Sequence, residues 1–164
     1  MRTEKPSIIL AADCAARLAL QTPAEPPPSI VLDTNAVLDC WLFQDPRAEM
    51  LREALEQGHL RWRATPEMLA ELAAVLVRPM AMRWNTQREC LLSHDLSCRA
   101  ILTATPTNPA DLRCTDPDDQ KFLDLAMQLR APWLVTRDRA LLRLKRRSAS
   151  QGVAILVPEH WPGR

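Results

Sequence analysis

The stretch SIVLDTNAVLDCWL, residues 29–42, joins a short apolar run to three polar side chains. The apolar residues predict a buried strand near 29–33, and Asp33, Thr34 and Asn35 stand at its end. In open sheets of parallel strands, ligand sites lie just beyond the carboxyl ends of the strands. An acid in this position therefore predicts a polar site at one edge of a sheet.

Beyond this stretch, short apolar runs alternate with longer helical patterns, which is typical of parallel strands joined by crossover helices. The predicted strands lie at 29–33, 60–64, 133–136 and 153–157. The predicted helices lie at 46–57, 66–77, 118–130 and 138–146, with one or two more between 86 and 104. The predicted fold class is therefore α/β.

The first 28 residues differ from the rest of the chain. An Ala-rich segment from Ser7 to Leu20 fits a helix, and QTPAEPPP at 21–28 is a Pro-rich tether that suits neither a regular helix nor a central strand. We expect an N-terminal extension over 1–28 and one folded domain over 29–164, since 164 residues suit a single domain.

Composition narrows the class of protein. With 47% hydrophobic residues the chain can form a sizeable core, yet its apolar runs are too short to span a bilayer and residues 8–20 lack the layout of a signal peptide. We therefore expect a cytoplasmic protein with no membrane partner. The five cysteines form no CxxC pair, so we expect them to be reduced, small buried residues.

The predicted helix at 66–77 carries two acids with different surroundings. Glu71 lies at the border of the apolar stripe, in the middle of the helix. Glu67 has an ordinary role as a first-turn acid favoured by the helix dipole, after Thr65 as N-cap and Pro66 in the first helical position. Glu71 has no such explanation.

The segment CTDPDDQKFLDLAMQL, residues 114–129, carries four aspartates. Asp119 projects from the first turn of the predicted helix on its inward side, whereas Asp124 falls on the opposite face and is expected to be solvated. Asp116 and Asp118 fit a capping role, with metal binding as the alternative.

A second strand also ends in an acid, because Asp138 closely follows WLVT at 133–136. Four acids then converge on one edge: Asp33, Glu71, Asp119 and Asp138. Clustered carboxylates raise one another's pKa and persist as anions only with a cation among them. Oxygen ligands without His or Cys favour Mg²⁺ or Mn²⁺. Such a site suits phosphodiester hydrolysis, because the metal activates a water and neutralises the leaving oxygen.

Each acid also has an ordinary structural role. Asp33 fits a turn former that bonds its own backbone, and Glu71 fits a helix-surface acid. Asp119 and Asp138 each fit the N-cap of the helix that follows. The shared edge of the sheet is what favours a common site over these separate roles.

Four segments together resemble the PIN domain family, a small metal-dependent nuclease fold. They are VLDTNAVLD (31–39), PEMLAELAAVLVRP (66–79), DPDDQKFLDLA (116–126) and LVTRDRALL (134–142), and they occur in the family's order. The resemblance covers Ser29 to Trp161. The most similar subgroup is the bacterial one described as toxin components of toxin–antitoxin systems.

The resemblance implies a three-layer fold whose mostly parallel sheet of four to five strands is flanked by helices. It implies that Asp33, Glu71, Asp119 and Asp138 are the catalytic and metal-binding acids, with Asn35 and Thr136 as polar support. It also implies a Mg²⁺- or Mn²⁺-dependent ribonuclease, often homodimeric, whose activity an antitoxin partner suppresses. Arg137 stands where the subgroup commonly has Gly, which affects no metal ligand.

The segment RDRALLRLKRR, residues 137–147, carries six of the twenty-one basic residues and one acid. Because an acid cluster repels a phosphate backbone, cations near the site must hold the RNA. The candidate RNA-binding residues are Arg137, Arg139, Arg143, Lys145, Arg146 and Arg147. The same run also fits a solvated helix face with its leucines turned inward. The five tryptophans fit core or dimer packing better than base stacking.

Other classes of protein compete with the nuclease. A non-catalytic RNA-binding or interaction module with the same fold is the main alternative, although the presence of all four acids argues against it. An aspartyl phosphatase needs a second acid two residues after the first, where Asn35 cannot donate a proton. A nucleotide-binding domain is disfavoured because the three glycines form no phosphate-cradling loop.

Overall fold

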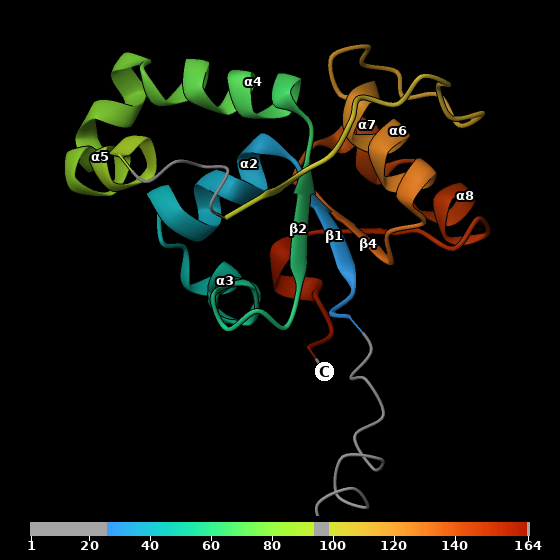
Figure 1. Ribbon diagram of the computed structural model, residues 1–164, viewed down its shortest axis with the longest axis horizontal. Helices are drawn as coiled ribbons and strands as arrows, with labels where there is room; N and C mark the ends of the chain where they lie inside the picture. Colours follow the sequence, from blue (N-terminus) through green and yellow to red (C-terminus); the bar gives the residue numbers. More distant parts are fainter. Residues whose placement is uncertain (1–25, 94–98, 164) are drawn as a thin grey trace, which may run out of the picture.

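The computed structural model of the protein describes residues 26–93 and 99–163. This part of the chain contains one sheet of five parallel strands in the order β3-β2-β1-β4-β5 (Figure 1). The strands are β1 (Ser29–Leu32), β2 (Arg61–Ala64), β3 (Ile101–Leu102), β4 (Trp133–Val135) and β5 (Ala154–Leu156). The predicted α/β fold with four to five mostly parallel strands is confirmed.

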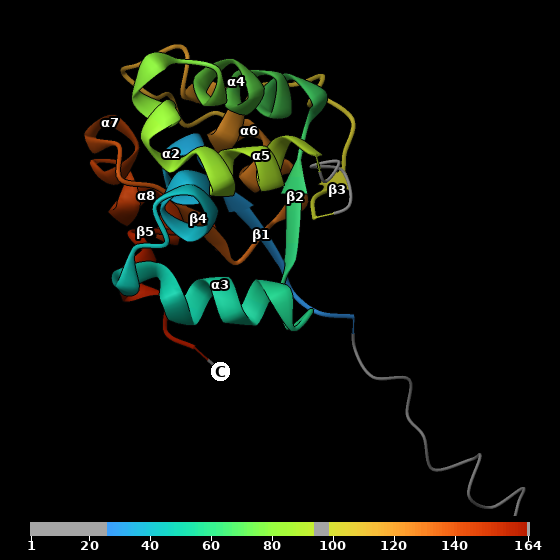
Figure 2. The same cartoon turned by 90° about the vertical axis from the view of Figure 1, so that its left-hand side faces the viewer.

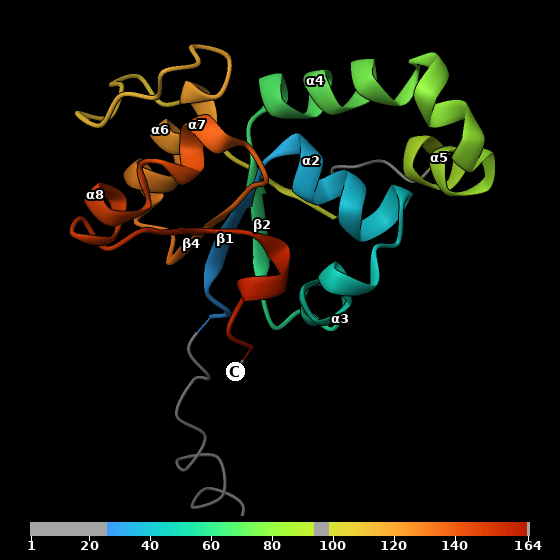
Figure 3. The ribbon, with the colours of Figure 1, turned by 180° about the vertical axis from the view of Figure 1, so that it is seen from behind.

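Helices cover both faces of this sheet, so the fold has three layers (Figures 1 and 3). One layer holds α2 (Thr34–Val37), α3 (Glu49–Glu56), α4 (Pro66–Leu76) and α5 (Asn85–Ser93). The other holds α6 (Gln120–Leu129), α7 (Arg139–Leu142) and α8 (Lys145–Ala149). A strand between two helical layers must be apolar on both sides, and Ile30, Val31 and Leu32 of β1 are accordingly almost fully buried.

Strand β1 lies at the centre of the sheet, between β2 and β4. Its register aligns Val31 with Arg63 of β2 and with Leu134 of β4, and Leu32 with Val135. Strands β1 and β4 therefore end level with each other. Figure 2 shows α4 at the carboxyl ends of β1 and β2, and α3 towards their amino ends. The residues that follow β1 and β4 consequently meet beneath α4 and beside the start of α6.

The start of α4 follows the prediction. Thr65 is its N-cap, with a side chain that accepts from the backbone N–H of Met68 at 3.4 Å, and Pro66 occupies the first turn. Helix α6 ends at Leu129, and the C-cap residue Arg130 has a left-handed φ of 48° that closes the helix. The capped start of α4 fixes the position of the helix that carries Glu71.

Three parts of the chain differ from the predicted elements. After β1 the chain turns at once into α2 and continues as a π-helix over Leu38–Leu42. Residues 101–102, predicted as helix, form the edge strand β3, because short apolar runs fit both periodicities. The single helix predicted at 138–146 is two short helices, since Leu144 bonds back to the carbonyl of Leu141 in a tighter turn.

The aromatic side chains pack against one another in the described ranges. The rings of Trp41 and Trp62 stack with centroids 5.5 Å apart, and those of Trp133 and Trp161 meet edge to face at 6.2 Å. These contacts fit the packing role expected for the tryptophans. Among the cysteines, Cys40 is buried as expected but Cys90 is exposed.

No helix within 26–93 or 99–163 is long and apolar enough to cross a membrane. The helix predicted from Ser7 to Leu20 and most of the Pro-rich tether lie outside the described residues. The division of the chain at residue 28 stays a prediction.

Replacing Leu32 by Ala tests the central strand. Leu32 is 2% exposed, so the substitution should lower the free energy of unfolding by about 2–5 kcal/mol through lost burial and a residual cavity. Urea unfolding followed by circular dichroism measures the change. Met50→Ala is the matched control, because Met50 is 60% exposed and its loss should have little effect. Equal destabilisation by the two changes would contradict the central position of β1.

Candidate active site

The ends of β1 and β4 bring Asp33 and Thr136 together at the carboxyl edge of the sheet. The backbone N–H of Asp33 donates to the carbonyl of Val135 at 3.0 Å. Thr136 is fully buried, and its hydroxyl donates to Oδ2 of Asp33. The same hydroxyl accepts from the backbone N–H of Asp138 at 2.8 Å. One threonine therefore positions both strand-end acids.

Asp33 is 2% exposed and forms the backbone turn expected of a strand-end acid. Its Oδ1 accepts from the backbone N–H of Asn35 at 2.6 Å, which caps α2. Burial raises the pKa of Asp33 to about 6, against the lowering effect of the hydrogen bonds from Thr136 and Asn35. The charges of Glu71 and Asp138 raise this pKa further. Asp33 therefore interacts electrostatically with two of the other predicted acids, Glu71 and Asp138.

Glu71 reaches the site from α4. Its Oε1 accepts from the hydroxyl of Thr34 at 2.6 Å, and its Oε2 lies 2.7 Å from the ammonium of Lys121. Thr34 is buried and directly follows Asp33, so α4 is tied to the end of β1. Helix geometry placed Glu71 at the border of the apolar stripe, and the side chain is accordingly 35% exposed.

Asp119 stands at the start of α6 and makes no side-chain hydrogen bond to the helix it precedes. Its Oδ2 is buried and lacks a hydrogen-bond partner among the described residues. Burial, followed by the charges of Asp138 and Asp33, raises the pKa of Asp119 to about 7. The N-cap hydrogen bond that would explain this acid as purely structural is therefore missing.

A cavity of about 540 Å³ joins three of the acids. Asp33, Glu71 and Asp119 line it from β1, α4 and α6. Asp138 does not line this cavity, but Thr136 links it to Asp33 by hydrogen bonds. Sequence reasoning missed other lining residues, which include Thr34, Leu38, Phe43, Val75, Arg78, Met80 and Lys121.

The acids of the cavity have the right donor atoms for a divalent metal ion, but they are not yet spaced to bind one. All donors are carboxylate or hydroxyl oxygens, and the unpartnered Oδ2 of Asp119 is a ready acceptor for a cation. Within 26–93 and 99–163, however, no three acidic, His or Cys side chains are placed closely enough to hold a metal as they stand. Lys121 is paired with Glu71 instead. Metal binding would therefore require side chains to rotate.

Two other aspartates near α6 have structural contacts. Oδ1 of Asp116 accepts from the backbone N–H of Asp118 at 2.9 Å, which shapes the turn before the helix. Asp124 was expected to be solvated, and this is wrong. It is half-buried and accepts from the backbone N–H of Ala110 and from Nε2 of Gln120, because the preceding loop folds back over the outer face of α6.

Arg137 is held by acids outside the cavity. Its Nε donates to Asp39, its Nη1 lies 3.0 Å from Glu159, and its Nη2 lies 3.6 Å from Asp45. Asp39 is buried, which raises its pKa, while the hydrogen bond from Arg137 lowers it. The guanidinium thus links the π-helix to the carboxyl-terminal segment.

The rest of the basic run lies on the surface. Leu141 and Leu144 are buried, as the solvated-face alternative expects. The exposed members of the run are Arg139, Arg143, Lys145, Arg146 and Arg147. This exposure is compatible with a phosphate track as well as with a solvated face, so RNA contact by these residues stays a prediction.

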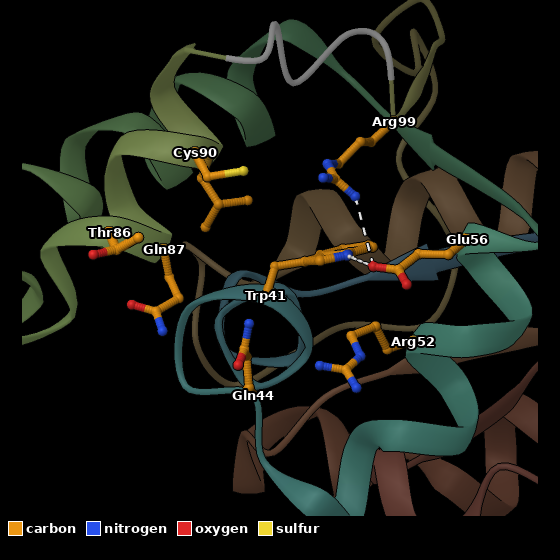
Figure 4. A pocket seen from close by; sticks show the side chains of 9 residues that line it. Trp41, Gln44, Arg52, Glu56, Thr86, Gln87, Cys90 and Arg99 are labelled. Atoms are coloured by element: carbon orange, nitrogen blue, oxygen red, sulfur yellow. Dashed lines mark hydrogen bonds and ion pairs between the residues drawn. The ribbon is translucent and has the colours of Figure 1, made fainter.

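A second cavity, of about 410 Å³, opens beside α3 and α5 (Figure 4). There the indole N–H of Trp41 donates to Glu56 at 3.0 Å, and the guanidinium of Arg99 lies 3.8 Å from the same carboxylate oxygen. Arg99 also lies 5.4 Å from the centre of the Trp41 ring. None of the four predicted acids lines this cavity, which separates it from the candidate active site.

The parallel sheet, with acidic side chains in a cavity at its carboxyl edge, defines a class, the three-layer α/β domains whose ligand sites lie beyond the strand ends. Within that class, the chain belongs to the PIN domain family, whose sequence model matches residues 29–140. The matched range contains Asp33, Glu71, Asp119 and Asp138. The PIN domain is a nuclease-type fold that is generally metal-dependent. No curated protein matched the chain.

The raised pKa values of Asp33 and Asp119 predict how the metal-free protein responds to pH. Both carboxyls start from 3.8 when unfolded and reach about 6 and about 7 when folded. The folded state therefore binds more protons between these values, so their contribution to stability is complete below 3.8 and is lost as the pH rises through 7. In EDTA, the Tm should fall by several degrees between about pH 5 and pH 8.

Asp119→Asn should flatten this dependence, because an amide cannot ionise. Asp111→Asn is the control, since Asp111 is an exposed loop residue outside the acid cavity. Thermal unfolding of the three proteins across this range measures the effect. A Tm that rises from about pH 5 to pH 8 in the wild type would contradict the shared burial of the acids.

The Arg137 contacts predict a mainly structural effect of its removal. Arg137→Gln leaves the buried carboxylate of Asp39 without its charged partner and should lower the free energy of unfolding by about 1–3 kcal/mol. Adding Asp39→Asn should recover much of this loss, because the uncompensated charge is then absent. Urea unfolding of both variants tests the pair, and a double variant no more stable than Arg137→Gln would count against it.

Proposed function

We propose that the protein is a Mg²⁺- or Mn²⁺-dependent endoribonuclease. Its catalytic, metal-binding residues are Asp33, Glu71, Asp119 and Asp138. The observation that carries the proposal is the buried, unpartnered Oδ2 of Asp119, which belongs to a residue of the same cavity as Asp33 and Glu71. Membership of a nuclease-type family supports RNA as the substrate.

The bound metal would activate a water and neutralise charge on the leaving oxygen. The chain's own residues orient the acids for this. Thr136 fixes the carboxylate of Asp33, and Thr34 fixes that of Glu71, so each acid keeps one oxygen in a defined direction. The raised pKa values of Asp33 and Asp119 imply that these carboxyls release protons when a metal binds near neutral pH.

The proposal extends to the biological role. The four-segment resemblance supports a toxin component that acts as a homodimer and is suppressed by an antitoxin. In this role the exposed basic residues of α7 and α8 serve as a track for the RNA backbone beside the acids. A small antitoxin-like reading frame adjacent to the gene would support the toxin role.

A non-catalytic RNA-binding module is the second candidate, and one contact favours it. The ammonium of Lys121 already neutralises Glu71, so the site has an internal cation where a metal would bind. Calorimetric titration with Mn²⁺ discriminates the two candidates. Tight RNA binding without Mn²⁺ binding would favour the module, whereas Mn²⁺ binding that Asp119→Asn removes would favour the nuclease.

Substitution of Asp33 and of Asp119 tests the catalytic proposal. Asp33→Asn and Asp119→Asn should each lower the rate of RNA cleavage by at least about 100-fold, since losing a group that merely orients a metal ligand costs about 10- to 100-fold. Neither change should unfold the protein, because an amide removes a buried charge without leaving a cavity. Cleavage of end-labelled RNA in Mg²⁺ or Mn²⁺ provides the measurement.

Asp111→Asn serves as the matched control and should cleave like the wild type, because Asp111 is exposed and lies outside the cavity. Excess EDTA should abolish cleavage by the wild type and by this control. Cleavage that persists in EDTA, or in both active-site variants, would exclude the metal mechanism.

A further inference from the structure

Lys121 places a positive charge among the acids of the cavity. Its ammonium lies 2.7 Å from Oε2 of Glu71 and donates to the carbonyl of Asp118 at 2.6 Å. The side chain is 15% exposed and lines the same cavity as Asp33 and Asp119. Sequence reasoning assigned no role to this residue.

Lys121 stands at a position where a positive charge does not stabilise α6. It stands in the first turn of the helix, two residues after Asp119, where the helix dipole disfavours a cation. An ammonium has three N–H donors, and Glu71 and Asp118 accept two of them. Glu67, the next acid, is 4.0 Å away, beyond hydrogen-bond distance. The ammonium also lies 5.2 Å from the centre of the Phe122 ring, which accepts no conventional hydrogen bond. The third N–H therefore has no hydrogen-bond acceptor among the described residues.

The cavity needs such a donor if RNA is to enter it. Asp33, Glu71 and Asp119 repel a phosphate group, and only two of the described lining residues, Lys121 and Arg78, are cations. Arg78 is exposed and lies beyond the end of α4, whereas Lys121 directly contacts one of the acids. Of these two lining cations, Lys121 is thus the one that contacts a candidate catalytic residue.

We propose that Lys121 is a substrate-binding residue that exchanges partners: its ammonium holds Glu71 in the metal-free protein and contacts an RNA phosphate once a divalent metal binds the acids. This inference rests on the proposed nuclease function and adds a residue to it. A metal ion and the ammonium compete for the same carboxylate, so occupation by one releases the other. A lysine suits this exchange because its charge sits on a flexible stem.

The structural alternative is that Lys121 only ties α4 to α6. Lys121→Met separates the two, because it keeps a side chain of similar length without the charge. Lys121→Arg keeps the charge. Arg130→Met is the matched control: it removes one cation from the opposite end of the same helix, at an exposed position outside the cavity.

Two measurements test the exchange. In otherwise wild-type protein, calorimetric titration should show that Lys121→Met binds Mn²⁺ severalfold more tightly, because a competing cation is gone. In protein with all four acids intact, fluorescence anisotropy with Mn²⁺ and a labelled single-stranded RNA, made resistant to cleavage by a phosphorothioate backbone, should show about tenfold weaker binding for Lys121→Met. The slope of log affinity against log salt should decrease by about 0.7, the value for one phosphate contact on a single strand.

Lys121→Arg should retain most of the RNA affinity, and Arg130→Met should change neither measurement. Equal effects of Lys121→Met and Arg130→Met on RNA binding, or unchanged RNA binding by Lys121→Met, would overturn the phosphate contact. Unchanged Mn²⁺ affinity in Lys121→Met would overturn the exchange. If these failures occur while the wild type cleaves RNA, the proposed function stands without this inference. A wild type that neither cleaves RNA nor binds Mn²⁺ overturns both.

Discussion

The structure depends on placing a carboxylate at the buried end of its central strand. Asp33 is 2% exposed, and an unpaired charge at this depth would oppose folding. The surrounding chain supplies hydrogen bonds in compensation, from the hydroxyl of Thr136 and the backbone N–H of Asn35. Even so, burial leaves the pKa of Asp33 at about 6. The two hydrogen bonds therefore offset only part of the cost of burying this charge, and a cation bound beside Asp33 would offset the rest.

Two basic residues meet the acids of the fold in different ways. Arg137 forms a fixed set of contacts with Asp39, Asp45 and Glu159, and its planar guanidinium suits several acceptors at once. Lys121 lines the cavity, and its ammonium contacts Glu71 and the carbonyl of Asp118. One cation stabilises the joint between the π-helix and the carboxyl terminus, while the other lies where substrate and metal would compete with it.

The sequence predicted the elements whose signals are local. The strand before Asp33, the capped start of α4 and the inward position of Asp119 follow from periodicity and capping chemistry, and all three are present. Contacts between distant segments could not be predicted. The pairing of Lys121 with Glu71, the three acids around Arg137 and the loop that covers Asp124 each depend on how helices and loops pack. Strand β3 was missed because two apolar residues carry no period.

The short length of β3 affects whether copies of the protein aggregate through the edge of the sheet. As the outermost strand beside β2, it presents backbone groups that another strand could pair with, and its side chains Ile101 and Leu102 are 42% and 52% exposed. A long apolar strand here would invite edge-to-edge aggregation. With only two residues, β3 offers too few hydrogen bonds to hold a second sheet. The short length of β3 therefore limits aggregation at this edge. Insertions that lengthen β3 would reduce solubility without changing the acidic cavity.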